Sequence, residues 1–161
     1  MLLETRQMHL TDFLDFEAIK PALPAGNKRS LLNQLASLAG NRLGVESAGI
    51  LATISEREKL GSTGFGQGVA IPHGKVEGLS EIYCLFVRLA EPVGYRAIDR
   101  KPVDLVFLLL SPPDAGAEHL KALAAISRVV RNAATLEKMR GARSRDALAA
   151  VLMAADERDA A

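Results

Sequence analysis

Hydrophobic residues recur every three or four positions in the first half of the chain, and this spacing is typical of an α-helix. Leucines share one face of residues 28–43, where Asn27 can cap a helix and Gly44 can end it. A second helix is predicted over residues 48–60, with Ser47 as its cap. The pattern therefore predicts two consecutive amphipathic helices.

Weaker helical patterns lie on both sides of this pair. A short helix is expected over residues 11–19, and Pro21 and Pro24 then break the chain. A longer helix is expected over residues 116–132. Its apolar face is predicted to contain Leu120, Leu123, Ala124 and Val130, and two closing helices are expected after caps at Thr135 and Ser144.

Three segments have the composition of β-strands. Residues 83–90, YCLFVRLA, and residues 102–113, PVDLVFLLLSPP, form the two longer ones, and residues 69–71 form a short one. The run VFLLL is apolar at every position, which fits a central strand covered on both faces. Because helices and strands alternate along the chain, the predicted class is α/β with helices packed on a sheet.

Length and composition fit one globular domain. The chain has 161 residues, of which 48% are hydrophobic and 24% charged. We expect a single domain over residues 1–155 and a frayed tail over residues 156–161. The formal net charge is +1, no basic block stands out and tryptophan is absent. A nucleic-acid partner is therefore not expected.

Two features indicate a cytoplasmic protein without a membrane segment. The N-terminal residues MLLETRQMHLTDF lack the apolar core of a signal peptide, and apolar runs such as residues 106–110 are far too short to span a bilayer. Cys84 is the single cysteine, so no intrachain disulfide can form. It lies in a strand-like apolar segment and is expected in the core.

Residues 61–74, GSTGFGQGVAIPHG, are the most unusual stretch. A P-loop would need lysine after its last glycine, but Gln67 stands there. A dinucleotide site would need G-x-G-x-x-G between a strand and a helix. Here Gly64, Gly66 and Gly68 give G-x-G-x-G, after a helix and before a strand. Both nucleotide-binding interpretations therefore fail on residue type and on the order of elements.

The end of this stretch is suited to presenting one imidazole. Pro72 has a fixed φ and holds Ile71 extended, so His73 follows a stiff segment. Gly74 removes bulk on its far side. The alternative is a solvent-exposed histidine in a Gly/Pro turn.

Two further residues favour phosphoryl chemistry. Arg57 ends the helix that leads into the loop, and His119 begins the helix that follows the buried strand. A neutral imidazole is a good nucleophile near pH 7, and arginine neutralises the oxygens of a transferring phosphoryl group. The alternatives are a solvated helix-end charge for Arg57 and a surface position for His119.

Other chemistries find less support. The residue types that could bind a metal have no H-x-x-x-H or C-x-x-C spacing, so no metal or other cofactor is expected. A serine or threonine nucleophile at Ser62 or Thr63 lacks the G-x-S-x-G turn. The metal-binding candidates considered were His9, His73, Cys84 and His119.

Residues 56–79, EREKLGSTGFGQGVAIPHGKVEGL, resemble the active-site region of the enzyme IIA family of the phosphoenolpyruvate phosphotransferase system, of the fructose/mannitol type. The likeness continues to DAGAEHLKALAAISRVVRN at residues 114–132 and is greatest to the nitrogen-regulatory branch. The resemblance implies a mixed central β-sheet flanked by helices. It also implies a transferase component that is itself a phosphoprotein.

The resemblance also assigns roles to particular positions. His73 would be phosphorylated on Nε2, Arg57 would lie beside the phosphate, and His119 would be the second active-site histidine. Phe65 and Gln67 differ from the Ile or Val and the Asn that are common in relatives, and this difference can tune docking. Supporting loop residues would be Ser62, Thr63, Gly66, Gly68, Pro72 and Gly74.

The implied donor is an HPr-like phosphocarrier charged through an enzyme I. The implied partners are regulatory targets such as potassium-transport components or sensor kinases. Phe65, Val69 and Ile71 could form an apolar docking rim around His73, unless Val69 and Ile71 belong to the core. One alternative function is a sugar-uptake IIA component that passes phosphate to a IIB partner. Another is a binding module without chemistry.

Overall fold

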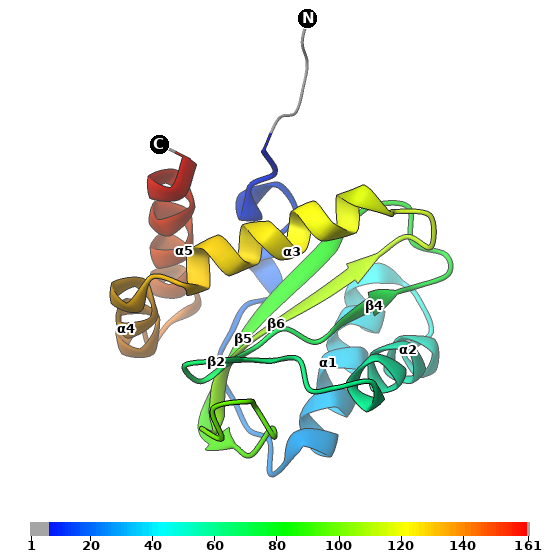
Figure 1. Ribbon diagram of the computed structural model, residues 1–161, viewed down its shortest axis with the longest axis horizontal. Coiled ribbons are helices and arrows are strands. Elements are labelled where there is room, and N and C mark those ends of the chain that lie inside the picture. The colour runs from blue at the N-terminus through cyan, green and yellow to red at the C-terminus, as the bar shows by residue number, and fades with distance from the viewer. Residues whose placement is uncertain (1–6, 161) are drawn as a thin grey trace, which may run out of the picture.

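The computed structural model describes residues 7–160, which form a sheet with helices on both faces (Figure 1). Two short 3₁₀ turns, η1 and η2, come first, and five α-helices and six strands follow. The turns are η1 (Leu10–Asp12) and η2 (Phe16–Ala18). The strands are β1 (Lys20–Leu23), β2 (Gly64–Gly66), β3 (Val69–Ala70), β4 (His73–Lys75), β5 (Tyr83–Val93) and β6 (Val103–Ser111). The helices are α1 (Lys28–Leu43), α2 (Ser47–Lys59), α3 (Ala117–Val130), α4 (Ala133–Gly141) and α5 (Arg145–Ala160).

The strands form one mixed sheet in the order β1-β5-β6-β3-β2, and β4 also pairs with β6. β5 and β6 are antiparallel, whereas β1 runs parallel to β5, and both β3 and β4 run parallel to β6. Short β2 pairs antiparallel with β3. This arrangement confirms the expected α/β class with a mixed central sheet flanked by helices.

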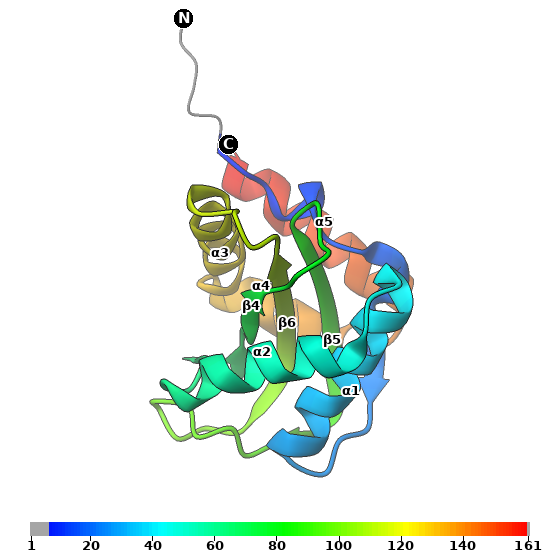
Figure 2. The same cartoon turned by 90° about the vertical axis from the view of Figure 1, so that its right-hand side faces the viewer.

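β6 is the central strand that the run VFLLL predicted. Its side chains alternate between two hydrophobic clusters, as expected for a strand covered on both faces. Leu105, Phe107 and Leu109 pack with α3, α4 and α5, and the side chains between them pack with α1 and α2. Figure 2 shows β4 and β6 lying between α3 and α2. Cys84 is fully buried in the first cluster, and burial raises the pKa of its thiol.

The ends of α1 follow the predicted capping chemistry. The Asn27 side chain accepts a hydrogen bond of 2.8 Å from the backbone N–H of Ser30. Gly44 adopts a left-handed conformation with φ of 68°, and its N–H donates to the carbonyl of Gly40. Ser144 also accepts the expected cap bond, from the N–H of Ala147 at 3.0 Å.

Other local predictions were wrong. Residues 11–19 contain parts of two 3₁₀ turns rather than one helix, and Pro21 lies inside strand β1. Leu120 is 67% exposed, because it falls outside the buried face of α3. Thr135 is buried within α4, whose cap is the side chain of Asn132. A side chain one residue before a helix is the usual cap, and an asparagine there competes well with a downstream threonine.

The C-terminal helix α5 runs through most of the segment expected to be a frayed tail. Asp156 is buried, and its carboxylate accepts hydrogen bonds from the backbone N–H groups of Leu10 and Thr11 at 3.1 and 2.9 Å. The prediction about an N-terminal signal peptide rests partly on residues 1–6, which lie outside the described residues. Over the described part of the chain, none of the helices has the length and apolar character to span a membrane.

Candidate functional site

His73 lies on an interrupted strand along one edge of β6. β3 pairs with Leu105 and Val106, and β4 pairs with the last three residues of β6. Pro72 lies between them and still takes part in the sheet, because its carbonyl accepts the N–H of Leu109 at 3.0 Å. Proline therefore separates two short strands without breaking their alignment, and His73 begins the second.

The apolar residues before Pro72 are core residues. Val69 is fully buried and Ile71 is 5% exposed, so they do not form a docking rim around His73. The structure thus supports the alternative considered for these two positions. Phe65 is 37% exposed and remains at the surface.

Gly74 lets α2 pack directly on β4. A Cβ atom at this position would lie 2.3 Å from Cγ2 of Thr53, which no side chain can accept without movement. Successive residues of a strand point to opposite faces. His73 therefore points away from Thr53 and toward α3. It lies at the edge of the sheet, where the side chain of Arg57 from the end of α2 can also reach it.

The glycines around Gln67 serve a different part of the molecule. Gly66 and Gly68 have φ of 107° and 80° and form the turn between β2 and β3. The Gln67 N–H donates to Asp99 at 2.9 Å, so this amide is already paired. The carbonyl of Gly68 accepts the N–H groups at the start of β6, whereas His73 pairs four residues farther along, about 13 Å away at strand spacing. These glycines shape a hairpin and have no hydrogen bond to His73 within residues 7–160.

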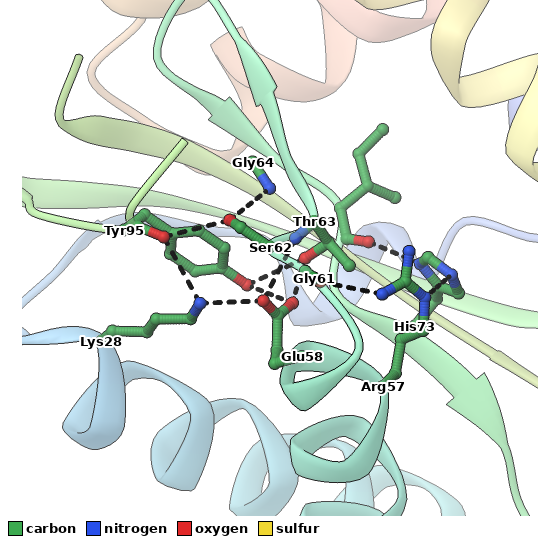
Figure 3. A network of polar contacts seen from close by, with 10 residues as sticks. Lys28, Arg57, Glu58, Gly61, Ser62, Thr63, Gly64, His73 and Tyr95 are labelled. Carbon is green, nitrogen blue, oxygen red and sulfur yellow. Dashed lines mark hydrogen bonds and ion pairs between the residues drawn. The ribbon is translucent and has the colours of Figure 1, made fainter. Parts of the chain in front are cut away.

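The hydrogen bonds of His73 define its tautomer. Nδ1 lies 2.7 Å from the carbonyl oxygen of Ile71, and a carbonyl can only accept, so Nδ1 carries the proton. The Nε–H of Arg57 donates to Nε2 at 3.2 Å, so Nε2 carries the lone pair (Figure 3). Burial first, and then the positive charge of Arg57, lower the pKa of His73, although the bond to Ile71 and the charge of Glu58 act in the opposite direction. The ring is therefore neutral near pH 7, with its nucleophilic nitrogen beside a guanidinium group.

Arg57 is held by a second bond in the last turn of α2. Its Nη1 donates to the carbonyl of Gly61 at 2.9 Å. The guanidinium is planar and rigid, so two fixed hydrogen bonds set both its position and its plane. The helix end and the following loop together aim this side chain at His73 (Figure 3).

The next residue, Glu58, organises the loop that follows α2. Its carboxylate is paired with Lys28 Nζ at 2.8 Å and accepts the hydroxyl of Tyr95 at 2.8 Å. It also accepts the backbone N–H of Thr63 at 3.1 Å and the hydroxyl of the same residue. Burial would raise the pKa of Glu58, but these bonds outweigh it and hold the pKa below its usual value. Glu58 is thus a buried carboxylate that fixes the loop beside Arg57.

Ser62 and Thr63 are structural parts of this loop. Ser62 Oγ donates to the carbonyl of Tyr95 at 3.1 Å and accepts the N–H of Gly64 at 3.0 Å. Thr63 is buried and contacts both Glu58 and Tyr95. The sequence motif contains Glu58, but no role was predicted for it, and Lys28 and Tyr95 were not predicted to belong to the site. These two lie far from the motif in the chain and carry no local pattern of their own.

His119 reaches His73 from α3, on the face of the sheet opposite α2, which carries Arg57. It is the third residue of α3 and is only 8% exposed, rather than being a surface residue. The two imidazole rings have centroids 5.4 Å apart at an angle of 53°. His119 Nδ1 lies 2.6 Å from Oγ of Ser111. Burial, followed by the charges of His73 and Lys75, lowers the pKa of His119 to about 4.

The structure therefore brings together the three residues that sequence analysis singled out for chemistry. Arg57, His73 and His119 come from α2, β4 and α3 and converge at one end of the sheet. Of the four metal-binding candidates, His73 and His119 lie together here, whereas Cys84 is buried in the core and His9 precedes η1. Among the described residues no group of three or more His, Cys, Asp or Glu side chains could hold a metal ion.

Comparisons with known proteins agree with this geometry. The family described as "Phosphoenolpyruvate-dependent sugar phosphotransferase system, EIIA 2" matches residues 12–155. The nitrogen regulatory protein of Bradyrhizobium diazoefficiens is 46% identical over 145 residues, which cover 90% of this chain and 95% of that protein. The nitrogen regulatory protein of Escherichia coli is 34% identical over 142 residues, covering 88% and 87%.

Solved structures give the same result. The crystal structure of nitrogen regulatory protein IIA-Ntr from Neisseria meningitidis superposes with a TM-score of 0.82 at 35% identity, covering 88% of this chain and 97% of that one. The mannitol IIA of Escherichia coli, with a TM-score of 0.71 at 19% identity and coverage of 86% and 97%, shares the fold. This chain therefore belongs to the EIIA 2 family of the phosphoenolpyruvate-dependent sugar phosphotransferase system, and it is similar to the nitrogen-regulatory members of that family.

Proposed function

We propose that the chain is a phosphohistidine carrier of a nitrogen-regulatory phosphotransferase system, and that Nε2 of His73 accepts the phosphoryl group from an HPr-like donor. One observation carries this proposal: the Ile71 carbonyl holds the proton on Nδ1, which leaves the Nε2 lone pair available beside Arg57. Relatives named nitrogen regulatory proteins, at up to 46% identity, support the branch.

The transfer needs positioning and charge stabilisation more than acid–base chemistry. The Nε2 lone pair attacks phosphorus while the bond between phosphorus and the donor's imidazole nitrogen breaks, and that nitrogen keeps the electron pair. The proton on Nδ1 of His73 stays in place, and its bond to Ile71 strengthens as the ring gains positive charge. Arg57 exchanges its bond to Nε2 for a phosphoryl oxygen, while its bond to Gly61 keeps the guanidinium in position.

Phosphorylation would change the surface that partners meet. A phosphoryl group adds a charge of about −1.5 to −2 and three strong acceptor oxygens. His73 is partly exposed at the sheet edge, so this charge would appear at the surface. Docking of regulatory targets, such as potassium-transport components or sensor kinases, would then depend on the phosphorylation state.

A sugar-uptake role is the second candidate. The fructose-specific EIIA component of Haloferax volcanii is 34% identical over 137 residues, covering 84% of this chain and 89% of that protein. Mannitol IIA of Escherichia coli, which shares the fold, has been solved in complex with phosphorylated mannitol IIB. In this role the same phosphohistidine would pass its phosphoryl group to a IIB partner.

The phosphotransfer assay tests the carrier function. The protein is incubated with phosphoenolpyruvate, enzyme I and HPr, and the acid-labile phosphate on the chain is measured. Wild type should gain about one phosphate, His73→Ala none, and the control His9→Ala as much as wild type, because His9 lies outside the site. Failure of the wild type to gain phosphate, or equal labelling of His73→Ala, would refute the proposal.

Two further measurements separate the roles. Adding fructose- or mannitol-type IIB domains should leave the phosphorylated chain charged if it is a regulator, and should discharge it rapidly if it serves sugar uptake. A non-catalytic binding module would instead regulate its partner normally when His73 is replaced by alanine.

A further inference from the structure

A buried hydroxyl lies behind the second histidine. Ser111 is the last residue of β6, has no exposed surface and follows a run of apolar side chains. It is two residues beyond Leu109, so it shares the sheet face that α3 covers. Its Oγ lies 2.6 Å from Nδ1 of His119 and makes no other hydrogen bond within residues 7–160.

The direction of this hydrogen bond follows from counting donors. If Nδ1–H donated to Oγ, the hydroxyl proton of Ser111 would be buried without an acceptor among the described residues. A buried donor left unpaired loses its hydrogen bond to water without replacement, which destabilises the fold. If Oγ–H donates to Nδ1 instead, both groups are satisfied. The second arrangement is the stable one, and it puts the ring proton of His119 on Nε2.

The Nε2 atom of His119 is available for a ligand. It makes no hydrogen bond to any residue that the structure describes, although His119 is only 8% exposed. Its ring lies beside that of His73, with centroids 5.4 Å apart. The pKa of His119, lowered to about 4 chiefly by burial, keeps this ring neutral near pH 7. The ring therefore carries a single N–H, which is the one on Nε2.

We infer that Ser111 is a positioning residue: its hydroxyl holds His119 in the Nε2–H tautomer and fixes the ring, so that Nε2–H donates to a phosphoryl oxygen on His73. This inference rests on the proposed function, in which His73 carries the phosphoryl group. Within residues 7–160 Ser111 has no hydrogen bond to His73, so it acts through His119. A neutral donor stabilises an oxygen of the transferring group without adding a second full charge beside Arg57.

The tautomer can be measured without any phosphoryl donor. In ¹⁵N-labelled wild-type protein at pH 7, long-range ¹H–¹⁵N spectra should show His119 with a protonated Nε2 and a hydrogen-bonded, unprotonated Nδ1. In Ser111→Ala the Nδ1 resonance should move to the value of an unbonded ring nitrogen. A protonated Nδ1 on His119 of wild type would overturn the inference.

The kinetic effect should act through His119 alone. Ser111→Ala should slow phosphoryl transfer from HPr about threefold to tenfold, since one hydrogen bond contributes about 0.5–1.5 kcal/mol. Ser111→Thr, which keeps the hydroxyl, should restore most of the rate. In a His119→Ala background Ser111→Ala should cause no further loss. An equal loss in that background would overturn the inference, because Ser111 would then act on something other than His119.

These outcomes separate the two proposals. If wild type takes up no phosphate, the proposed function fails, while the ¹⁵N spectra still decide the tautomer. If wild type is phosphorylated but His119 carries its proton on Nδ1, only the role of Ser111 fails. Denaturant unfolding of each variant shows whether it is folded, and the wild-type spectra decide the question even if Ser111→Ala does not fold.

Discussion

Replacing Gly74 by alanine tests whether close packing of α2 on β4 builds the site. The new Cβ would lie 2.3 Å from Thr53 Cγ2 but 3.5 Å from Thr53 Cβ, so the clash involves one methyl group. Overpacking of this kind costs about 1–3 kcal/mol. The φ of Gly74 is not in the left-handed region, so alanine also gains about 0.4–1 kcal/mol by restricting the unfolded chain. The net loss should be about 1–2 kcal/mol.

The measurement is denaturant-induced unfolding with an unchanged slope m, so that the midpoint reports stability. In thermal unfolding the same loss corresponds to roughly 2–8 °C for a chain of this size. Gly49→Ala is the matched control. Gly49 is exposed within α2, nothing lies within 4 Å of its added Cβ, and alanine there should stabilise the helix by about 0.5–1 kcal/mol.

The second variant removes the methyl group that clashes. Thr53→Ser deletes Cγ2 and keeps the hydroxyl, so Gly74→Ala combined with Thr53→Ser should recover most of the stability. Phosphoryl acceptance should follow the same order, because a displaced α2 would carry Arg57 away from His73. A loss below about 0.5 kcal/mol in Gly74→Ala would show that the Thr53 side chain rotates away from the new methyl group. If the double variant Gly74→Ala/Thr53→Ser recovered no stability, the destabilising contact would lie elsewhere. Either result would refute this reasoning.

Tyr95→Phe removes the hydroxyl that Glu58 accepts, and it should lower the free energy of unfolding by about 0.5–1.5 kcal/mol, measured with denaturant; an unchanged midpoint would contradict the role given to this bond. For His119, the folded state binds the proton more weakly, with a pKa of about 4 against 6.5. Above pH 6.5 the ring is neutral in both states, so His119 does not reduce the free energy of unfolding. As the pH drops to about 4, the unfolded state takes up the proton first, and the free energy of unfolding falls by about 3 kcal/mol. His119→Asn should lack this part of the acid destabilisation, and a variant with the same pH dependence as wild type would argue against a lowered pKa. Because the pKa of His73 is lowered, the rate of phosphoryl acceptance should fall to half of its maximum only at a pH below 6.5. Arg57→Gln removes a charge that lowers this pKa, so it should raise the pH of the half-maximal rate. Initial phosphorylation rates between pH 5 and 8 measure both, and a midpoint at or above 6.5 in wild type would oppose the prediction.

Much of the architecture could be predicted because its signals are local. Asn27 and Gly44 mark the ends of α1 by chemistry that acts within a few residues. The run VFLLL marks the central strand because both of its faces are covered. The site histidine could be located in the same way, since Pro72 fixes the backbone before His73 and Gly74 removes bulk after it.

The missed elements depend on contacts between distant segments. Strands of three or four residues, such as β1 and β2, are too short for a periodic pattern and exist because a neighbour pairs with them. The bond between Glu58 and Tyr95 joins residues 37 positions apart. Ser111 reads as the polar end of a strand, and only the fold shows that it meets His119.

The prolines of this sheet also bear on self-association. Free backbone N–H and C=O groups along a sheet edge can pair with a second copy of a chain and seed aggregates. Pro21 lies inside the edge strand β1, where it lacks an N–H and its carbonyl is bonded to Arg88. On the other side, Pro72 separates β3, whose outer edge is paired with β2, from the short edge strand β4. Neither edge offers a long row of unpaired backbone groups to an incoming strand, so His73 lies at a sheet edge that is poorly suited to pairing with a second copy of the chain.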